Sequence, residues 1–459
     1  MEQRYSIILS IFLVFSCAKE DLVEDDIIDN PVIQNEWLTF SERYSAVNET
    51  TAYFKNQEYF ERYLSQAFID NILGSYREGN CSYKVFNKNS VVTDIDGDLL
   101  PDVVAFANSI CEGQPFSSSN GKFVVLRDYK SNTQIKVYDA EYTQGNAKMD
   151  VGKFLNKKGN QVLFQTHETK TNLVVEEEND FGGFSDNAPK SPSILYWENG
   201  LKVKKVGIVM DSHSGTSGDI DNDGDVDFIQ FPIPGFWSVE DTYKPPSLAV
   251  NSGTDEFTNI DLITDLSERW YSTATELFDI NQDGNLDLIV GWRIGTIKEQ
   301  VNSGDITNTI SGPVILYGNG TGTFSISNSI TLTENTLTNK GFQAGILGYA
   351  FTDYDLDGDI DIVVSTTREE PGGNFNDGTY YDNYHLIFYK NEAGTFIDST
   401  TLINSDNSND VPNFYFLRTI DKDNDGDYDL VPDGWANFGK YYGPNIHWVN
   451  QDGMFIRNN

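Results

Sequence analysis

Short apolar runs rich in β-branched residues alternate with turns of Gly, Asn and Asp over residues 83–459. Runs such as residues 287–290 and 362–364 are too short for helices and have the composition of buried strands. Polar turns between apolar runs at residues 314–324, 386–396 and 446–455 predict hairpins of antiparallel strands. The pattern therefore predicts an all-β region over residues 83–459.

A different period precedes this region. Apolar residues within residues 36–82 recur at three- and four-residue steps, which is the period of an amphipathic helix. Gly74 and Gly79 follow the last of them and are typical of a helix end. We expect a short helical segment over residues 36–82 that packs against the β region or spaces it from a membrane.

A nine-residue loop rich in Asp stands before a strand at five places, starting at residues 94, 219, 279, 353 and 421. The fourth loop carries a carboxylate at every odd position and Gly358 at position 6. Candidate metal ligands at the odd positions are Asp94, Asp96, Asp98 and Asp102; Asp219, Asp221, Asp223, Asp225 and Asp227; Asp279, Asn281, Asp283, Asn285 and Asp287; Asp353, Asp355, Asp357, Asp359 and Asp361; and Asp421, Asp423, Asp425, Asp427 and Asp429.

Carboxylates at this density repel one another and suit a hard cation. Ca²⁺ takes six to eight oxygen ligands, and Gly at position 6 permits the sharp turn that the loop needs. An EF-hand would place Glu at position 12, but Val364 stands there and a strand follows, so Asp361 is expected to close the site. We predict about five Ca²⁺ sites. The first loop departs from the pattern, with Leu99 in place of Gly and with Pro101 before Asp102.

The loops recur at 60–74 residues after the second one, and the first interval is about twice as long. Residues 149–164 lie where a missing repeat is expected and lack the carboxylates, so we interpret them as a non-binding relic. One strand before each loop and three after it make a four-stranded unit. Six such units predict a β-propeller, which removes exposed sheet edges. A seventh blade hidden in residues 36–82 is the alternative.

These five loops, each followed by a strand, resemble the FG-GAP/VCBS repeats that also build the heads of integrin α-chains. The resemblance covers roughly residues 83–459 and implies a calcium-binding β-propeller. Each loop offers about six or seven oxygens of its own. A structural role for the ions is therefore favoured over an open coordination position that binds a ligand.

The pattern of the N-terminal residues predicts a targeting segment. Arg4 precedes an apolar run over residues 7–15 that is too short to span a bilayer, and the sequence ending in Cys17 resembles a bacterial lipobox. Residues 1–17 are predicted to be a lipoprotein signal peptide with lipidated Cys17, and residues 18–35 an acidic tether. The acidic residues after Cys17 resemble the surface-export signal of Bacteroidetes lipoproteins. This places the protein on the outer membrane, facing outward. An ordinary secretory signal and a plain solvated tether are the alternatives.

The formal net charge of −38 disfavours nucleic acid and anionic membrane surfaces as partners, so contact with the membrane is expected only through the lipid anchor. The sequence does not indicate an oligomeric state. An exported protein meets an oxidising compartment, and a disulfide between Cys81 and Cys111 is predicted to join the first repeat to the segment before it.

No catalytic motif stands out, and the four His residues lie in different repeats without metal-ligand spacing. The variable inserts carry aromatic and Arg side chains suited to a sugar or a peptide. The candidate ligand-binding residues are Trp237, Trp292, Arg293, Tyr380 and Trp435. Their alternative role is to fill space between blades.

We expect a cell-surface binding or scaffold module for a glycan or protein ligand, rather than an enzyme. The alternatives are a lyase-like polysaccharide-degrading enzyme and an adhesion or assembly component.

Overall fold

A computed structural model describes part of the chain, all within the unit formed by residues 38–459. The described residues are 77–78, 81–100, 102–111, 121–128, 134–140, 148–165, 192–208, 210, 212–232, 244–267, 270, 272, 274–291, 312–333, 335, 343–368, 383–404, 416–420, 425–433, 447–451 and 453–458. The predicted signal peptide, the tether and most of residues 36–82 lie outside them. β1 (Arg77–Glu78) and the start of β2 stand a few residues before position 83, where we placed the start of the β region.

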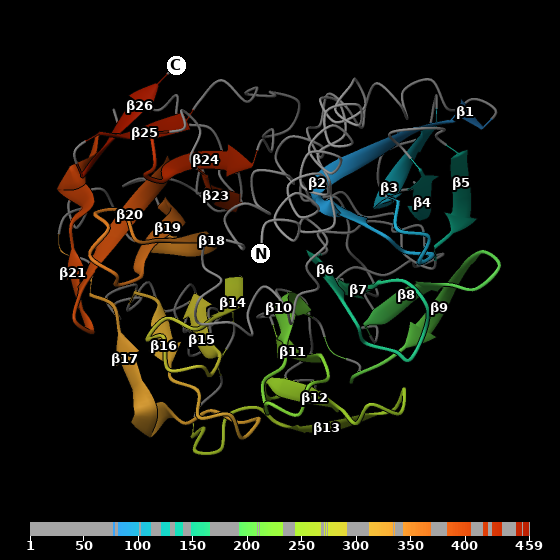
Figure 1. The fold of residues 1–459 in the computed structure, drawn as a ribbon, viewed down its shortest axis with the longest axis horizontal. Coiled ribbons are helices and arrows are strands. Elements are labelled where there is room, and N and C mark those ends of the chain that lie inside the picture. Colours follow the sequence, from blue (N-terminus) through green and yellow to red (C-terminus); the bar gives the residue numbers. More distant parts are fainter. Residues whose placement is uncertain are drawn as a thin grey trace, which may run out of the picture. The chain divides into compact units, whose positions relative to one another are not determined.

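The described residues form six sheets, labelled by strand in Figure 1. The first contains β1, β2 (Cys81–Thr93), β3 (Asp102–Cys111), β4 (Gly121–Arg127) and β5 (Gln134–Asp139). The second contains β6 (Lys148–Gly152), β7 (Gln161–Gln165), β8 (Ser193–Trp197) and β9 (Leu201–Lys205). The third contains β10 (Ser212–Gly218), β11 (Asp227–Pro232), β12 (Ser247–Asn251) and β13 (Phe257–Asp261).

The fourth sheet contains β14 (Ala274–Phe278), β15 (Asp287–Gly291), β16 (Val314–Leu316) and β17 (Ser329–Thr331). The fifth contains β18 (Gln343–Thr352), β19 (Asp361–Arg368), β20 (Asn383–Glu392) and β21 (Thr395–Asp398). The sixth contains β22 (Ile403–Asn404), β23 (Phe416–Ile420), β24 (Asp429–Asp433), β25 (His447–Gln451) and β26 (Met454–Asn458). Two 3₁₀ turns, η4 (Ile326–Asn328) and η7 (Thr400–Leu402), stand near the edge strands.

The all-β prediction is confirmed for the described residues, because each sheet contains four consecutive antiparallel strands. Residues 149–164, predicted to be a relic repeat, span the first two strands of the second sheet and the loop between them. Strands in second position, such as β7, β11 and β15, are buried along their whole length. The fourth strands β9 and β13 are largely exposed, and β9 carries three Lys side chains that discourage pairing with another chain.

Consecutive sheets contact one another through their first strands, from β2 to β6 and onward through β10, β14 and β18 to β23. Aromatic side chains fill these junctions. The rings of Phe278 and Phe351 stack at 4.5 Å between the fourth and fifth sheets, and Tyr354 packs against Phe455 between the fifth and sixth. The junctions therefore bury large apolar side chains between adjacent sheets.

A parallel strap joins some sheets to the next one along the chain. β22 follows the fifth sheet and pairs in parallel with β26 of the sixth. Ile263 follows β13 of the third sheet and forms a parallel bridge to Phe324 of the fourth. The hairpin pattern did not predict these links, since they join residues about 50–60 positions apart. Among the described residues, none of the helices has the length and apolar character required to cross a membrane.

Candidate metal centres

The Asp-rich loops connect the first and second strands of their sheets, and the same register closes each of them. The residue before position 1 pairs with position 9 in every sheet: Thr93 with Asp102, Gly218 with Asp227, Phe278 with Asp287, Thr352 with Asp361 and Ile420 with Asp429. The second sheet has the same pairing, between Gly152 and Gln161. Asp421 and Asp423 of the fifth loop lie outside the described residues.

The carboxylate at position 1 holds the turn by accepting backbone N–H groups. Asp353 accepts from Asp357 at 2.9 Å and from Gly358 at 3.0 Å. Asp219 and Asp279 accept from the equivalent pair of N–H groups in their own loops. Asp94 accepts from three groups, in Gly97, Asp98 and Leu99. This wrap directs several carboxylates of one loop toward a common region.

The backbone has a positive φ at position 6 of all five loops and at position 4 of the first four. Position 6 is Gly in the second to fifth loops, with φ between 90° and 101°, whereas Leu99 of the first loop has φ 71°. Position 4 is Gly97 in the first loop, and in later loops it is a residue with a side chain, such as Leu356 with φ 56°. A residue with a side chain is strained at a positive φ. The first loop has this strain at position 6, where the later loops have Gly, and avoids it at position 4, where the later loops do not have Gly.

The carboxylate at position 9 ties each loop to the third strand. Asp227 is fully buried, and its Oδ2 accepts from the N–H of Ile220 at 3.2 Å while its Oδ1 accepts from Asn251 at 2.8 Å. Asp102, Asp287 and Asp361 make the same two kinds of hydrogen bond, and Asp429 accepts from Asn450. Sequence reasoning assigned position 9 to metal binding alone and missed this second role.

Burial strongly raises the pKa of the position-9 carboxyls. The pKa is about 7 for Asp102 and Asp287 and about 8 for Asp227 and Asp361, mainly because burial penalises the charged form. Nearby Asp side chains add to the rise, and backbone N–H groups oppose it. A cation in the loop would favour the charged carboxylates.

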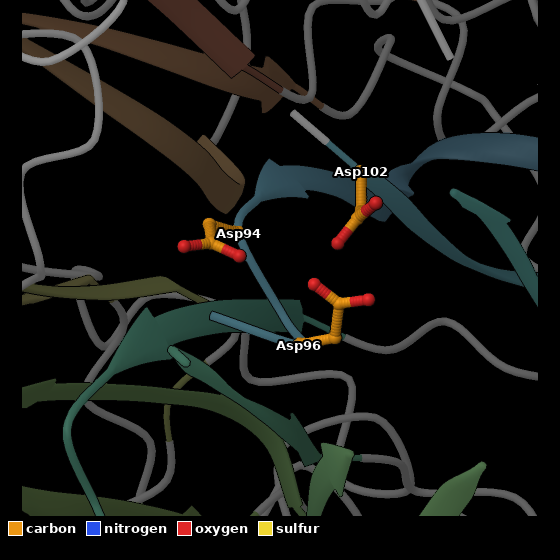
Figure 2. A group of neighbouring side chains, drawn as sticks. All are labelled: Asp94, Asp96 and Asp102. Carbon is orange, nitrogen blue, oxygen red and sulfur yellow. The ribbon is translucent and has the colours of Figure 1, made fainter. Parts of the chain in front are cut away.

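Three of the loops bring carboxylates together closely enough to share one ion. One oxygen from each of Asp94, Asp96 and Asp102 lies within 4.8 Å of the others, and Figure 2 shows this group. Asp219, Asp221 and Asp227 form the same triad in the second loop, and Asp353, Asp355 and Asp357 form a group in the fourth. In the third loop Asn281 and Asn285 stand at positions 3 and 7 and offer amide oxygens. These oxygen donors fit Ca²⁺ chemistry.

The loop of the second sheet has the same frame without the carboxylates. Gln161 replaces the Asp at position 9, and its side-chain oxygen accepts from Leu155 N–H at 2.9 Å. Lys153 stands at position 1, and its Nζ donates to the carbonyl of Gly159 at 2.6 Å. A tethered ammonium and a neutral amide therefore close this loop, and the absence of metal binding here stays a prediction.

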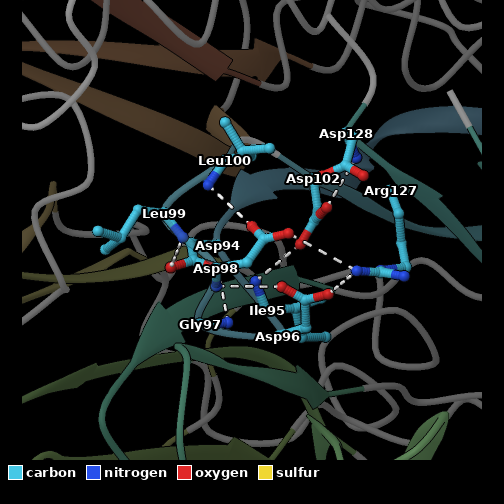
Figure 3. A network of polar contacts seen from close by, with 10 residues as sticks. All are labelled: Asp94, Ile95, Asp96, Gly97, Asp98, Leu99, Leu100, Asp102, Arg127 and Asp128. Carbon is cyan, nitrogen blue, oxygen red and sulfur yellow. Dashed lines mark hydrogen bonds and ion pairs between the residues drawn. The ribbon is translucent and has the colours of Figure 1, made fainter. Parts of the chain in front are cut away.

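Two cationic side chains lie against Asp-rich loops, and sequence reasoning missed both. Arg127 forms an ion pair with Asp96, as the network in Figure 3 shows. Lys390 lies 2.8 Å from Asp355 in the fourth loop. Each stands directly before the residue whose N–H binds the position-9 carboxylate, so the two positions are equivalent. These two cations are recognised as loop partners only from the register between each loop and the third strand of its sheet, which the sequence does not give.

The other predicted site residues have different outcomes. Trp237, Trp292, Arg293, Tyr380, Trp435 and Cys17 lie outside the described residues. Cys81 and Cys111 are direct partners across β2 and β3, so both belong to the first sheet. Residues paired in this way have Cα atoms about 4.5–5.5 Å apart, within the range of a disulfide. The disulfide stays a prediction, and it would lie across two strands of one sheet.

No protein-family model matches the chain, and no curated protein matches it. Among solved structures, a rhamnogalacturonan lyase of Bacillus licheniformis is similar with 11% identity and a TM-score of 0.40 over 83% of this chain and 58% of its own. The exotype rhamnogalacturonan lyase YesX gives 11% and 0.41 over 83% and 57%, and YesW gives 12% and 0.31 over 81% and 60%. The chain thus spans less than two thirds of their length. At these TM-scores the similarities assign no activity to this chain.

Proposed function

We propose that the protein is a calcium-stabilised binding or scaffold module built on a β-propeller. The observation that carries this proposal is the repeated loop frame. In four loops, a position-1 carboxylate that wraps the turn and a buried position-9 carboxylate hold further oxygen donors close together. Such a concentration of negative charge is stabilised by a divalent cation.

Of the five predicted sites, we assign ions to the second to fifth loops, because Arg127 already pairs with Asp96 in the first loop. Asp219, Asp221, Asp223, Asp225 and Asp227 supply the carboxylates of the second loop. The residues at the same positions serve in the next three loops, with Asn281 and Asn285 among those of the third. Bound Ca²⁺ would neutralise these groups and fix the connection between the first two strands of each blade. Because the donors come from within single loops, we assign the ions a structural role.

The propeller proposal rests on the succession of sheets. Six four-stranded units follow one another along the chain, and consecutive units contact through their first strands. This arrangement suits six blades that present their first strands inward. It also agrees with the FG-GAP/VCBS resemblance of the loops, and we extend that family assignment to the chain as part of the proposal.

The ligand would bind through the inserts that follow the second strands. Trp237, Trp292, Arg293, Tyr380 and Trp435 belong to these inserts and suit a glycan or a protein surface. Export through the predicted signal, with a lipid on Cys17, would present this face outside the outer membrane. An adhesion or assembly role is a form of the same proposal in which the ligand is a protein.

Two measurements test the proposal. Calorimetric titration of chelated protein with Ca²⁺ should give about four sites from the second to fifth loops, and complete absence of binding would contradict the metal assignment. Glycan-array and outer-membrane pull-down experiments should then give binding that Trp237→Ala or Trp292→Ala weakens at least tenfold. Release of unsaturated sugars from a uronate polymer would instead identify an enzyme and overturn the binding-module assignment.

A further inference from the structure

The first loop already has a cation supplied by the chain. Arg127 ends β4, and its Nη2 forms an ion pair with Asp96 Oδ2 and lies 3.7 Å from Asp98 Oδ2. These carboxylates stand at positions 3 and 5, which the other loops offer to a metal. The Arg127 side chain is only 22% exposed, so water weakens this pairing less than it would at the surface.

A residue of the second sheet also contacts the guanidinium. Arg127 Cζ lies 5.2 Å from the ring centroid of Trp197, which ends β8. The Trp197 ring also packs edge-on against Tyr138 of the first sheet. A guanidinium that lies over an aromatic ring and is paired with carboxylates is held in place more firmly than a flexible Lys would be. A metal ion entering the first loop would have to displace it.

The second loop is a natural control for this arrangement. Asp219, Asp221 and Asp227 form the same triad as Asp94, Asp96 and Asp102, with the same separation limit of 4.8 Å. The residue equivalent to Arg127 is the one before Asn251, which is Val250. In the fifth loop the equivalent residue is Val449, because the next N–H binds Asp429. Two matching oxygen sets therefore differ in having or lacking a tethered cation. The fourth loop is intermediate, because Lys390 at the equivalent position pairs with Asp355 but also lies 3.4 Å from Glu392.

We propose that Arg127 takes the place of the metal in the first loop, so that this loop closes without Ca²⁺. Asp96 and Asp98 thus form an internal ion-pair site with Arg127, although the spacing of the carboxylates in this loop matches that of a metal loop. Leu99 at position 6 agrees with a loop released from the usual pattern. The proposal rests on the proposed function only for its contrast with the second loop.

The decisive test compares two matched substitutions at position 3. Asp221→Asn should remove one Ca²⁺ site from the calorimetric count, or weaken one site at least tenfold. Asp96→Asn should leave the number of sites and their dissociation constants unchanged within twofold. If Asp96→Asn removes a site as Asp221→Asn does, the first loop binds metal and the proposal is wrong.

Exchanging the two equivalent residues gives the converse test. Arg127→Val should lower the melting temperature in chelator, add one Ca²⁺ site and regain the lost stability when Ca²⁺ is supplied. Val250→Arg should remove one site and reduce the melting shift that Ca²⁺ produces. A folded Arg127→Val protein without an additional site would overturn the proposal, and if this variant fails to fold, the Asp96→Asn comparison decides.

Failure of the proposed function would look different. If the wild-type protein bound no Ca²⁺ at all, the calcium assignment of the second to fifth loops would fall. The role of Arg127 would then be judged in chelator alone, where Arg127→Val should lower the melting temperature more than Lys122→Val. Lys122 stands on the same strand and pairs with the exposed Asp139. Equal effects of the two substitutions would overturn the Arg127 assignment.

Discussion

A single leucine shows how far the first loop has moved from the repeat. Leu99 is 73% exposed and has φ 71°, so its side chain gains little from packing while its backbone is strained. A left-handed conformation costs an L-residue roughly 1–2 kcal/mol, and Gly avoids that cost. Gly also has more freedom in the unfolded chain, which opposes the gain by roughly 0.5–1 kcal/mol.

We therefore expect Leu99→Gly to stabilise the protein by about 0.5–1 kcal/mol, measured by chemical denaturation. Leu100→Gly is the matched control, since Leu100 is a neighbouring exposed leucine without a positive φ. It should destabilise by about 0.5–1 kcal/mol through unfolded-state entropy alone. Equal destabilisation by both substitutions would mean that Leu99 is not strained.

Between elements, a buried amide ties the third sheet to the second. Asn251 Nδ2 donates to the carbonyls of Phe154 at 3.1 Å and Val226 at 3.2 Å, and its Oδ1 accepts from Gly253 N–H at 3.1 Å. Phe154 belongs to the loop of the second sheet, so the contact crosses between sheets. Asn450 repeats it by donating to the carbonyl of Tyr354 at 2.8 Å. These contacts join neighbouring sheets through their loops.

Replacing Asn251 with Ala should destabilise the protein by about 2–4 kcal/mol. The buried carbonyls of Phe154 and Val226 would lose their hydrogen-bond donor, and no water would replace it. Asn259→Ala, at an exposed site on β13, should change the unfolding free energy by less than about 0.5 kcal/mol. Chemical denaturation of both variants in chelator measures the difference without contributions from metal. A loss at Asn251 no larger than at Asn259 would show that the sheets do not depend on this contact.

A carboxylate also caps the η4 turn, and its effect depends on pH. Asp265 accepts from Ile326 N–H at 2.6 Å, Ser325 Oγ at 2.8 Å and Ser327 N–H at 3.0 Å. These hydrogen bonds, led by the one from Ile326, lower the pKa of Asp265 to about 2. Because the folded pKa lies below the unfolded value, this stabilisation is present above pH ~4 and is lost as the pH falls toward ~2.

Asp265→Asn should therefore lower the melting temperature at neutral pH, and the difference from wild type should shrink between pH ~4 and ~2. Asp261→Asn, at an exposed position of β13, serves as the control for removal of one negative charge. Thermal melts across this pH range test both variants. A difference for Asp265→Asn that stayed constant with pH would contradict the capping role of the ionised carboxylate.

At the scale of the molecule, the sequence predicted what local patterning determines. Apolar runs predict strands such as β11 and β15. The spacing of Asp, with Gly at position 6, predicts the loops before them. The pairing of Arg127 with Asp96 was not predictable, because it depends on register between residues about 30 positions apart. The β22–β26 strap and the Asn251 contact depend in the same way on how sheets follow one another.

The net charge of −38 gives the last prediction, which concerns the whole chain. In chelator, mutual repulsion destabilises the folded state, so raising NaCl from about 0.05 to about 0.5 M should raise the melting temperature by several degrees.

Carboxylates within one loop lie too close together for salt to screen their repulsion fully. Millimolar Ca²⁺ at constant ionic strength should therefore raise the melting temperature further and flatten its dependence on NaCl. Mg²⁺ should have a smaller effect, since it requires a tighter octahedral site and sheds water reluctantly. Equal shifts with Mg²⁺ and Ca²⁺ would instead indicate general screening of an acidic surface, and the loops would then have no role as specific calcium sites.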